Sequence, residues 1–442
     1  MMKTPICDFL KSYTALNTVR LHMPGHKGHG ELCALDITEI PGADSLYSAD
    51  GIIAESERYA GELFGADTFY SAEGSSLSIR AMIYLATLWA EEIGRQPLIL
   101  AGRNAHKSFI SGVALLGLRV EWLPSGSESY LSSRVDTEYL EKRLSEGEAP
   151  SAVYITSPDY LGFEENIKDI SEVCHRHGVM LLVDNAHGAY LKFLPTSRHP
   201  IDLGADMCCD SAHKTLPAIT GAAYLHISRS APSIFKERAR EALSLFGSTS
   251  PSYLILSSLD RTNGYIASGY RDVLASFIDR LDSLKSEIIS LGYTLVGDEP
   301  MKLTVYAKPY GYTGEELAEC LCQSGIVCDF ADPDYTVLMP TPENDESDIS
   351  RLLAALRGIP RREKIGDTPP RFFTPTVKMS PREAILSPAV CLPLSECRGR
   401  VLATASVSCP PAVPILVPGE LIDEAAITAF EYYGIKNLFV TK

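Results

Sequence analysis

The sequence predicts an α/β fold in which helices cover both faces of a parallel or mixed β-sheet. Over the first two-thirds of the 442 residues, short apolar runs that end at turn residues alternate with segments of helical periodicity. Parallel strands need crossover connections, usually helices, so this alternation is typical of a sheet buried between helices. A chain of this length also has room for two or three domains.

Five short apolar runs are the predicted strands of this sheet. They lie at residues 98–101, 152–156, 179–183, 206–209 and 222–227. Helical patterns lie around them, for example at residues 76–93 and 169–177. Each run is only four to six residues long and closes at turn-forming residues, which favours a strand over a buried helix.

The character of the sequence changes at about residue 273. The segment 273–291 is amphipathic and predicts a helix that leads into a smaller α+β unit. The segment 359–384 is rich in Pro, Arg and Lys, so it is the predicted linker to a final unit. We therefore expect a large domain over 1–272, a small α+β domain over 273–365 and a C-terminal domain over 366–442.

Composition and charge argue against several kinds of partner. The formal net charge is −16, and such a surface repels nucleic acid and anionic membranes. The longest mostly apolar stretch, at 81–90, is far shorter than the roughly 20 residues that span a bilayer, and the N-terminus lacks a signal-peptide core. Eleven cysteines without a repeating frame indicate free thiols in a reducing compartment. We expect a cytoplasmic protein.

Histidine is scarce, yet half of the histidines fall in compact polar motifs. Ten are present, and five lie at predicted strand ends or Gly-rich turns: His22, His26, His106, His187 and His213. In open α/β sheets, ligands bind at the loops beyond the carboxyl ends of the strands. These loops are therefore where we expect the functional site.

Two charged residues follow predicted buried strands. Asp184 ends one apolar run, and Lys214 follows another among small residues. The aspartate either caps the next turn or pairs with a protonated ring nitrogen. The lysine is either a solvated surface residue or an amine held close to a cofactor.

A third polar motif opens the predicted helix at 76–93. Glu73, Gly74, Ser75 and Ser76 offer free backbone N–H groups and two hydroxyls to a phosphate, although such a run is also an ordinary N-cap. An anion site, a carboxylate and a lysine together meet the needs of pyridoxal 5′-phosphate. The three motifs jointly predict this cofactor.

Motifs for other chemistries are missing from the sequence. It contains no Cys-x2-Cys or His-Glu-x2-His, and the pair Cys320 and Cys322 has no partners at ligand spacing, so no metal site is predicted. Walker A, Gly-x-Gly-x2-Gly and Gly-x-Ser-x-Gly patterns are absent as well. These absences favour the cofactor interpretation.

Taken in order, the polar motifs resemble those of a known family. The motifs similar to the ornithine/lysine/arginine decarboxylases of aminotransferase fold type I are HMPGHK at 22–27, RNAHKS at 103–108, VDNAHG at 183–188 and SAHKTLP at 211–217. Further matches are TSPSY at 249–253, MSPREA at 379–384 and the tail from Pro410 to Glu420. The matches span nearly the whole chain, which resembles the short form of the family.

The resemblance implies the fold and the roles of the cofactor residues. It implies a large domain with a mixed, mostly parallel sheet, a small domain and a C-terminal domain. Lys214 would form the internal aldimine, Asp184 would pair with the pyridinium nitrogen, and His106 would stack on the ring. The other implied contacts to cofactor phosphate and lysine are Gly74, Ser75, Ser76, His187, Ser211 and His213.

The resemblance also implies an assembly. Thr249 and Ser250 would reach the phosphate of the neighbouring subunit. A homodimer would then be the smallest active unit.

The sequence departs from the family pattern at six positions. Asn185 stands where an acidic residue is usual, and Glu73 stands where Asn is usual. The other departures are Asp159 for a neutral residue, Tyr47 for a frequent His, Cys409 for Tyr and Ala412 for Gly. A glutamate near a phosphate is an electrostatic cost unless its side chain points away. These changes leave the cofactor prediction intact and put the usual substrate in doubt.

The predicted function is decarboxylation of arginine, lysine or ornithine to CO2 and the corresponding amine. Lys214 or His213 would return a proton to the substrate Cα. The alternatives are another fold type I reaction, such as transamination or elimination, and a catalytically silent cofactor-binding subunit. A cationic substrate end needs a buried acid, and the two candidates are Asp329 and Asp159.

Overall fold

The computed structural model describes all residues except 1, 17, 126–128 and 406–412. The chain forms two compact units. The first unit comprises residues 1–97, 144–154 and 167–274, and the second comprises residues 98–143, 155–166 and 275–442. The departures Cys409 and Ala412 lie outside the described residues. The three-domain division that we expect from the sequence stays a prediction.

A seven-stranded sheet has the order β1-β7-β6-β5-β4-β2-β3. In chain order its strands are β1 (Asp67–Ser71), β2 (Leu98–Ala101), β3 (Arg119–Trp122), β4 (Ala152–Thr156), β5 (Met180–Asp184), β6 (Met207–Asp210) and β7 (Ala223–Ile227). The pairs β5–β6 and β2–β3 are parallel, and β7 runs antiparallel to both β1 and β6. The predicted α/β fold with a mixed sheet is thus present, and all five predicted strands form.

Two strands of this sheet were not predicted. The strand β1 has the sequence DTFYS and β3 has the sequence RVEW, so neither is an apolar run. The strand β3 is only partly buried, because its first residue is exposed and the other three are intermediate. Polar residues are tolerated in a partly buried strand such as β3, so a search for apolar runs does not find it.

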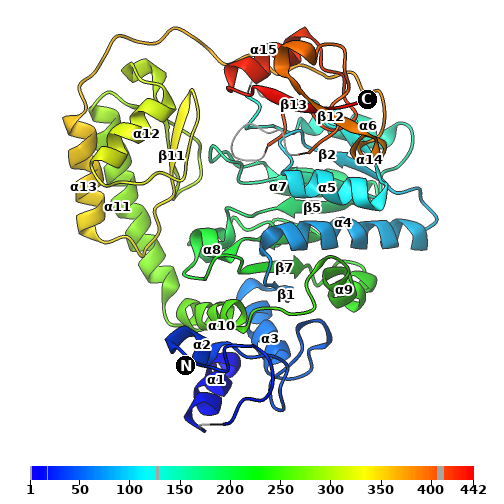
Figure 1. Cartoon of the computed structure of the whole chain (residues 1–442), viewed down its shortest axis with the longest axis vertical. Helices are drawn as coiled ribbons and strands as arrows, with labels where there is room; N and C mark the ends of the chain where they lie inside the picture. Colours follow the sequence, from blue (N-terminus) through cyan, green and yellow to red (C-terminus); the bar gives the residue numbers. More distant parts are fainter. Residues whose placement is uncertain (1, 17, 126–128, 406–412) are drawn as a thin grey trace. The chain divides into compact units, whose positions relative to one another are not determined.

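Helices of the first unit pack on the strands that carry the polar motifs. They are α1 (Pro5–Ala15), α2 (Glu31–Leu35), α3 (Ile52–Phe64), α4 (Gly74–Glu92), α7 (Ile167–Arg176), α8 (Ala212–Thr215), α9 (Ser233–Phe246) and α10 (Tyr253–Ala267). The helix α4 packs against β1, β5, β6 and β7 and also against α9 (Figure 1). The helix α3 packs against β1 and α10. The predicted helices at 76–93 and 169–177 correspond to α4 and α7.

The second unit contains two smaller sheets. One is antiparallel, with the order β10-β11-β9-β8, formed by β8 (Thr294–Val296), β9 (Leu303–Tyr306), β10 (Phe330–Ala331) and β11 (Tyr335–Leu338). The other pairs β12 (Ala389–Pro393) with β13 (Asn437–Thr441). The accompanying helices are α5 (Lys107–Leu116), α12 (Gly314–Gln323), α13 (Glu346–Gly358), α14 (Pro381–Leu386) and α15 (Glu424–Tyr432). Residues 360–376 have no helix or strand, as expected of a linker.

The boundaries between the units contain two further helices. They are α6 (Thr137–Ser145) and α11 (Tyr270–Ser290). The predicted amphipathic helix at 273–291 corresponds to α11. Its apolar side chains Leu274, Phe277, Leu281, Leu284 and Ile288 are buried, as the periodicity indicates.

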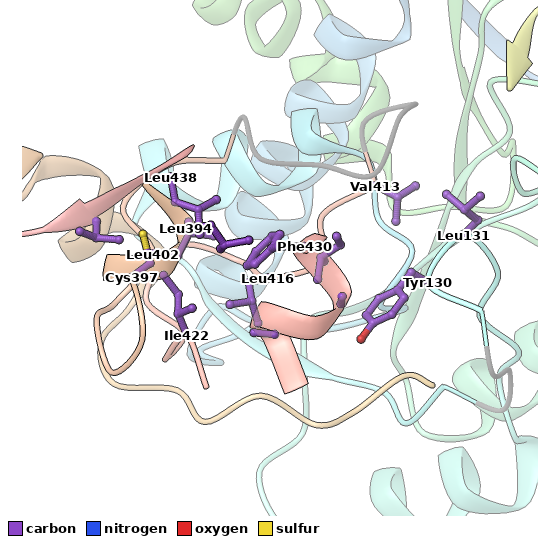
Figure 2. Packing of buried hydrophobic residues seen from close by; sticks show 14 of the residues in the cluster. Tyr130, Leu131, Leu394, Cys397, Leu402, Val413, Leu416, Ile422, Phe430 and Leu438 are labelled. Carbon is purple, nitrogen blue, oxygen red and sulfur yellow. The ribbon is translucent and has the colours of Figure 1, made fainter. Parts of the chain in front are cut away.

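A hydrophobic cluster holds the C-terminal segment within the second unit. Figure 2 shows Phe430 and Leu416 between Leu438 on one side and Tyr130 on the other. These side chains are almost completely buried, so they contribute a continuous apolar core. No helix in the described part of the chain is both long and apolar enough to cross a membrane.

Candidate active site

The carboxylate of Asp184 is buried at the carboxyl end of β5. Its side chain is 3% exposed. Its Oδ1 accepts a hydrogen bond from Ala186 N at 3.2 Å and from the thiol of Cys209 at 3.6 Å, and its Oδ2 accepts one from the hydroxyl of Tyr154 at 3.2 Å. All three donors are neutral, and no ion pair to Asp184 occurs among the described residues. A buried carboxylate with only neutral donors is suited to a cationic partner.

Lys214 and two histidines form the second part of the site. Lys214 lies in the short helix α8, which follows β6 directly, and its Nζ is 2.7 Å from Nε2 of His187. His187 is buried in the turn after Asp184. The Nδ1 atom of His213 lies 2.9 Å from the carbonyl oxygen of Ala222. A hydrogen bond donated by Nδ1 to this carbonyl fixes the orientation of the ring. Burial, together with the nearby charge of Lys214, lowers the pKa of His213 below its ordinary value.

The N-terminus of α4 forms the third part of the site. Gly74 has φ of +70° and begins a helix of 19 residues, so the first-turn N–H groups have no intrahelical acceptors. The hydroxyl of Ser211 donates to that of Ser75 at 2.9 Å, which brings the segment ahead of Lys214 to this helix end. Ser75 and Ser76 are only partly buried. The donor set suits a phosphate.

Two departures from the family pattern meet beside this helix end. The Oε1 atom of Glu73 accepts a hydrogen bond from Ser248 N at 2.5 Å. Burial and the charge of Glu73 together raise the pKa of Tyr47 to about 12. The Glu73 carboxylate thus has a backbone donor in the segment that carries Thr249 and Ser250. Both of these residues are exposed.

The second unit contains His106 and a buried ion pair. His106 caps α5, because its Nδ1 accepts from Ser108 N at 3.2 Å. Arg103 donates to the Glu420 carboxylate at 2.7 Å, and both side chains are almost completely buried. The arginine also lies over the ring of Trp122. This pair joins the RNAHKS motif to the PGE end of the C-terminal motif, which sequence spacing did not reveal.

The two candidate substrate acids differ in their surroundings. The Oδ1 atom of Asp159 accepts from Leu161 N and Phe163 N, both at 2.9 Å, and the residue is 2% exposed. Its carboxylate is therefore engaged within its own turn. Burial raises the pKa of this carboxyl above its ordinary value, against the opposing effects of a hydrogen bond from the Ser132 side chain, the two backbone hydrogen bonds and the charge of Lys302. Asp329 is exposed, and its backbone N–H donates to Val337 O at 2.9 Å just before β10.

A buried polar cluster lies behind the site and was not predicted. The Oδ2 atom of Asp210 is 3.0 Å from Nε2 of His199 and 3.2 Å from Nε2 of His226. Potential ligand atoms of His199, Cys208 and Asp210 lie within 4.8 Å of one another, but the N···O distances are those of hydrogen bonds. In the sequence, the only indication of this cluster is Asp210, which ends an otherwise apolar run directly before Ser211.

The residues of the first unit fit pyridoxal phosphate. They provide a helix end with hydroxyls for a phosphate, a buried carboxylate for a ring nitrogen, and an amine next to a histidine. Described residues form all three features, and the features lie in different loops of the same unit. Asp184, Lys214, His187, Ser75 and Ser211 are the residues that would hold the cofactor.

Comparison with known proteins identifies the family. Residues 4–305 match the model of the Orn/Lys/Arg decarboxylase major domain, and residues 371–441 match that of the C-terminal domain. The chain belongs to the Orn/Lys/Arg decarboxylase family. The predicted family, the cofactor pyridoxal phosphate and the reaction class, decarboxylation of a basic amino acid, are thereby confirmed.

Similar proteins cover nearly the whole decarboxylase chain. An arginine decarboxylase of Halalkalibacterium halodurans is 30% identical over 96% of this chain and 92% of its own. An arginine decarboxylase of Bacillus subtilis is 29% identical over 99% of this chain and 94% of its own. The constitutive lysine decarboxylase of Escherichia coli has a TM-score of 0.79 at 18% identity, over 100% of this chain and 82% of that one. The last match confirms the predicted fold.

Proposed function

We propose that this decarboxylase acts on arginine in preference to lysine and ornithine, and that pyridoxal phosphate binds around Asp184 and Lys214. The buried carboxylate of Asp184, which receives only neutral donors, carries the assignment of the site. A protonated ring nitrogen supplies the missing positive charge. Two relatives named arginine decarboxylase, similar over nearly their full length, support the choice of arginine.

In this proposal each residue has one task. The bound cofactor supplies an electron sink for the bond that breaks when CO2 leaves. Asp184 keeps the ring nitrogen protonated, and Lys214 holds the cofactor covalently. Lys214 is also the better candidate to return the proton to Cα, because the lowered pKa of His213 leaves that ring neutral at pH 7. His187, at 2.7 Å from Nζ, orients the lysine.

We further propose a homodimer with the active site at the subunit interface. Large apolar side chains are exposed around the N-terminal HMPGHK motif. They are Leu16, Val19, Leu21, Met23 and Leu32, each 64–91% exposed. Several exposed large apolar side chains in one segment of the chain favour a surface that a partner covers. Thr249 and Ser250 are exposed in one protomer, which supports a role toward the phosphate of the partner.

The proposed location is the cytosol. All ten described cysteines are free thiols. This supports a reducing compartment, where disulfides are rare.

A product assay with a substrate panel tests the proposed function. The purified protein is saturated with pyridoxal phosphate and given arginine, lysine, ornithine or leucine, with CO2, amine and keto acid measured together. We expect CO2 and amine in equal amounts, with the highest kcat/KM for arginine. Keto acid as the main product would identify an aminotransferase, and no product at all would identify a silent subunit. A preference for leucine would overturn the basic substrate.

Substitution of the two candidate acids separates substrate recognition from folding. If the exposed Asp329 becomes a desolvated contact to the substrate cation in the dimer, Asp329→Asn lowers kcat/KM for arginine by about 30-fold or more. Asp159→Asn is the matched control, because its carboxylate serves its own turn. We expect it to lower the melting temperature and to leave the ranking of substrates unchanged. Wild-type kinetics in the Asp329 variant would remove that residue from the substrate site.

A further inference from the structure

Asn185 and Asp210 lie at the carboxyl ends of the adjacent parallel strands β5 and β6. The register pairs Asp184 with Cys209, so Asn185 and Asp210 come next on the two strands. Because side chains alternate along a strand, these two point away from the face that Asp184 and Cys209 share. The Nδ2 atom of Asn185 donates to Oδ1 of Asp210 at 2.6 Å, and both residues are 0% exposed.

The carboxylate of Asp210 has a complete set of donors. Its Oδ2 is within hydrogen-bond distance of Nε2 of both His199 and His226, and its Oδ1 takes the amide of Asn185. Burial by itself disfavours the charge of Asp210, but the two histidines outweigh it and hold its pKa below the ordinary value. The carboxylate of Asp210 is therefore held in its charged form, and the neighbour at 185 is a donor.

The pair connects two backbone segments that carry cofactor residues. Asn185 directly follows Asp184, and Asp210 directly precedes Ser211, whose hydroxyl donates to Ser75. A second bond, from Asn185 N to Cys209 O at 3.0 Å, ties the same two segments. A displacement of either strand end would move Asp184 or the segment leading to Lys214.

We propose that Asn185 and Asp210 form a positioning pair for the cofactor site, in which one amide and one carboxylate lock the strand ends that present Asp184 and Lys214. The proposal rests on the proposed cofactor site and assigns a purpose to the departure at Asn185. An acid at 185 would place a second carboxylate against Asp210 at hydrogen-bond distance. The two charges would repel unless a proton were shared between them.

The hydrogen bond between the two positions can be kept with its donor and acceptor exchanged. In the double variant Asn185→Asp/Asp210→Asn, the amide oxygen at 210 takes the place of Oδ2 and accepts from the histidines. The amide nitrogen at 210 then donates to the carboxylate at 185. Every hydrogen bond of the wild type has a counterpart, but the carboxylate at 185 has one donor where Asp210 has three, and the position of Asn185 Oδ1 has no donor among the described residues. The pair therefore predicts partial rescue of the Asn185→Asp single variant.

The test is a titration of the four proteins of this cycle with pyridoxal phosphate, alongside melting curves without cofactor. We expect Asn185→Asp to bind the cofactor about tenfold more weakly than wild type or worse at pH 8. In Asn185→Asp, repulsion from Asp210 gives the new carboxyl a higher pKa in the folded protein than in the unfolded chain. Its destabilising effect is absent below the unfolded pKa, near 4, and grows as the pH rises toward the folded pKa. In the melting curves without cofactor, the destabilisation of Asn185→Asp relative to wild type should therefore shrink at about pH 5.5. The affinity of Asp210→Asn should lie between those of the wild type and Asn185→Asp, and the double variant should bind the cofactor more tightly than Asn185→Asp.

Other ionisable groups near the pair must be followed in the pH series. They are His199, His226, Cys208, Cys209, Tyr224, Lys192, Asp202 and Asp184. The wild type, titrated in parallel, supplies their contribution, because it keeps all of them. Only the difference between the wild type and Asn185→Asp reports on the pair.

A matched control uses a second buried asparagine of the same unit. Asn263 is 1% exposed and donates to the hydroxyl of Tyr70 at 2.6 Å. Asn263→Asp also buries an added acid, but Asp210→Asn should not rescue it, because no hydrogen bond joins the two residues. Equal rescue of both asparagine variants would show a general effect of charge removal and overturn the pair.

Three further outcomes separate the possible failures. If the wild type does not bind pyridoxal phosphate, the proposed function fails and melting curves alone test the pair. If the wild type binds but the double variant is as weak as Asn185→Asp, the positioning pair fails. A stoichiometric transition metal in purified wild type, lost in Asp210→Asn, would overturn the hydrogen-bonded interpretation of the cluster.

Discussion

Lys214→Ala is expected to abolish the visible absorption of bound cofactor and to reduce decarboxylation by at least about a thousandfold. The reason is that the cofactor is proposed to be attached to Nζ of Lys214, which lies 2.7 Å from Nε2 of His187. Alanine has no amine in its side chain. Borohydride reduction of the wild type should fix the cofactor mass on the peptide that contains Lys214. Absorption spectra and peptide mass spectrometry measure both effects.

A surface lysine provides the control for this variant. Lys236 pairs with Asp67 on the exposed side of α9, so Lys236→Ala removes an amine without approaching the proposed site. We expect it to keep the absorption and the activity. An unchanged spectrum in Lys214→Ala would show that another amine holds the cofactor.

The first part of the site was predictable because a buried strand that ends in a charged residue is informative in sequence. The run MLLVD of β5 forms as expected, and its last residue is the buried Asp184. A carboxylate at the end of a buried strand is rarely left without a hydrogen-bonding or charged partner, so its position in the sequence indicates a functional or structural role. The same reasoning located Lys214 after β6.

The partners of these residues could not be predicted, because they are distant in sequence. Tyr154 lies within a buried strand, and nothing in its spacing connects its hydroxyl to Asp184. The hydrogen bond from Ser248 to Glu73 spans 175 positions, and the one between Asn185 and Asp210 spans 25. Strand order and register create these contacts, and a single sequence does not state them.

The structure changes how the departures from the family pattern are interpreted. Glu73 accepts from a backbone N–H, Asn185 donates to Asp210, and Asp159 closes its own turn. Each of these three has a compensating partner, so none of the three requires the loss of the cofactor site. This argues against the silent-subunit alternative, whose only support was the departures themselves.

Asp184→Asn is expected to keep the fold and to lower kcat by about a hundredfold or more. The amide has the same shape, and its oxygen still accepts from Ala186 N, so the melting temperature should change little. The negative charge next to the ring nitrogen is lost, and with it the protonated state that withdraws electrons. Steady-state kinetics at saturating cofactor measures the effect.

Tyr154→Phe separates the charge of Asp184 from its hydrogen bonds. It removes the hydroxyl donor at 3.2 Å from Oδ2 and leaves the carboxylate in place. We expect a smaller loss in kcat than in Asp184→Asn, since the carboxylate charge remains and only one of its three hydrogen bonds is removed. If Asp184 served only to cap its turn, its Asn variant would keep its stability, because asparagine caps as well as aspartate, and would turn over near the normal rate. A large loss of turnover in Asp184→Asn, beside a small one in Tyr154→Phe, would therefore assign the effect to the carboxylate charge and not to the local structure.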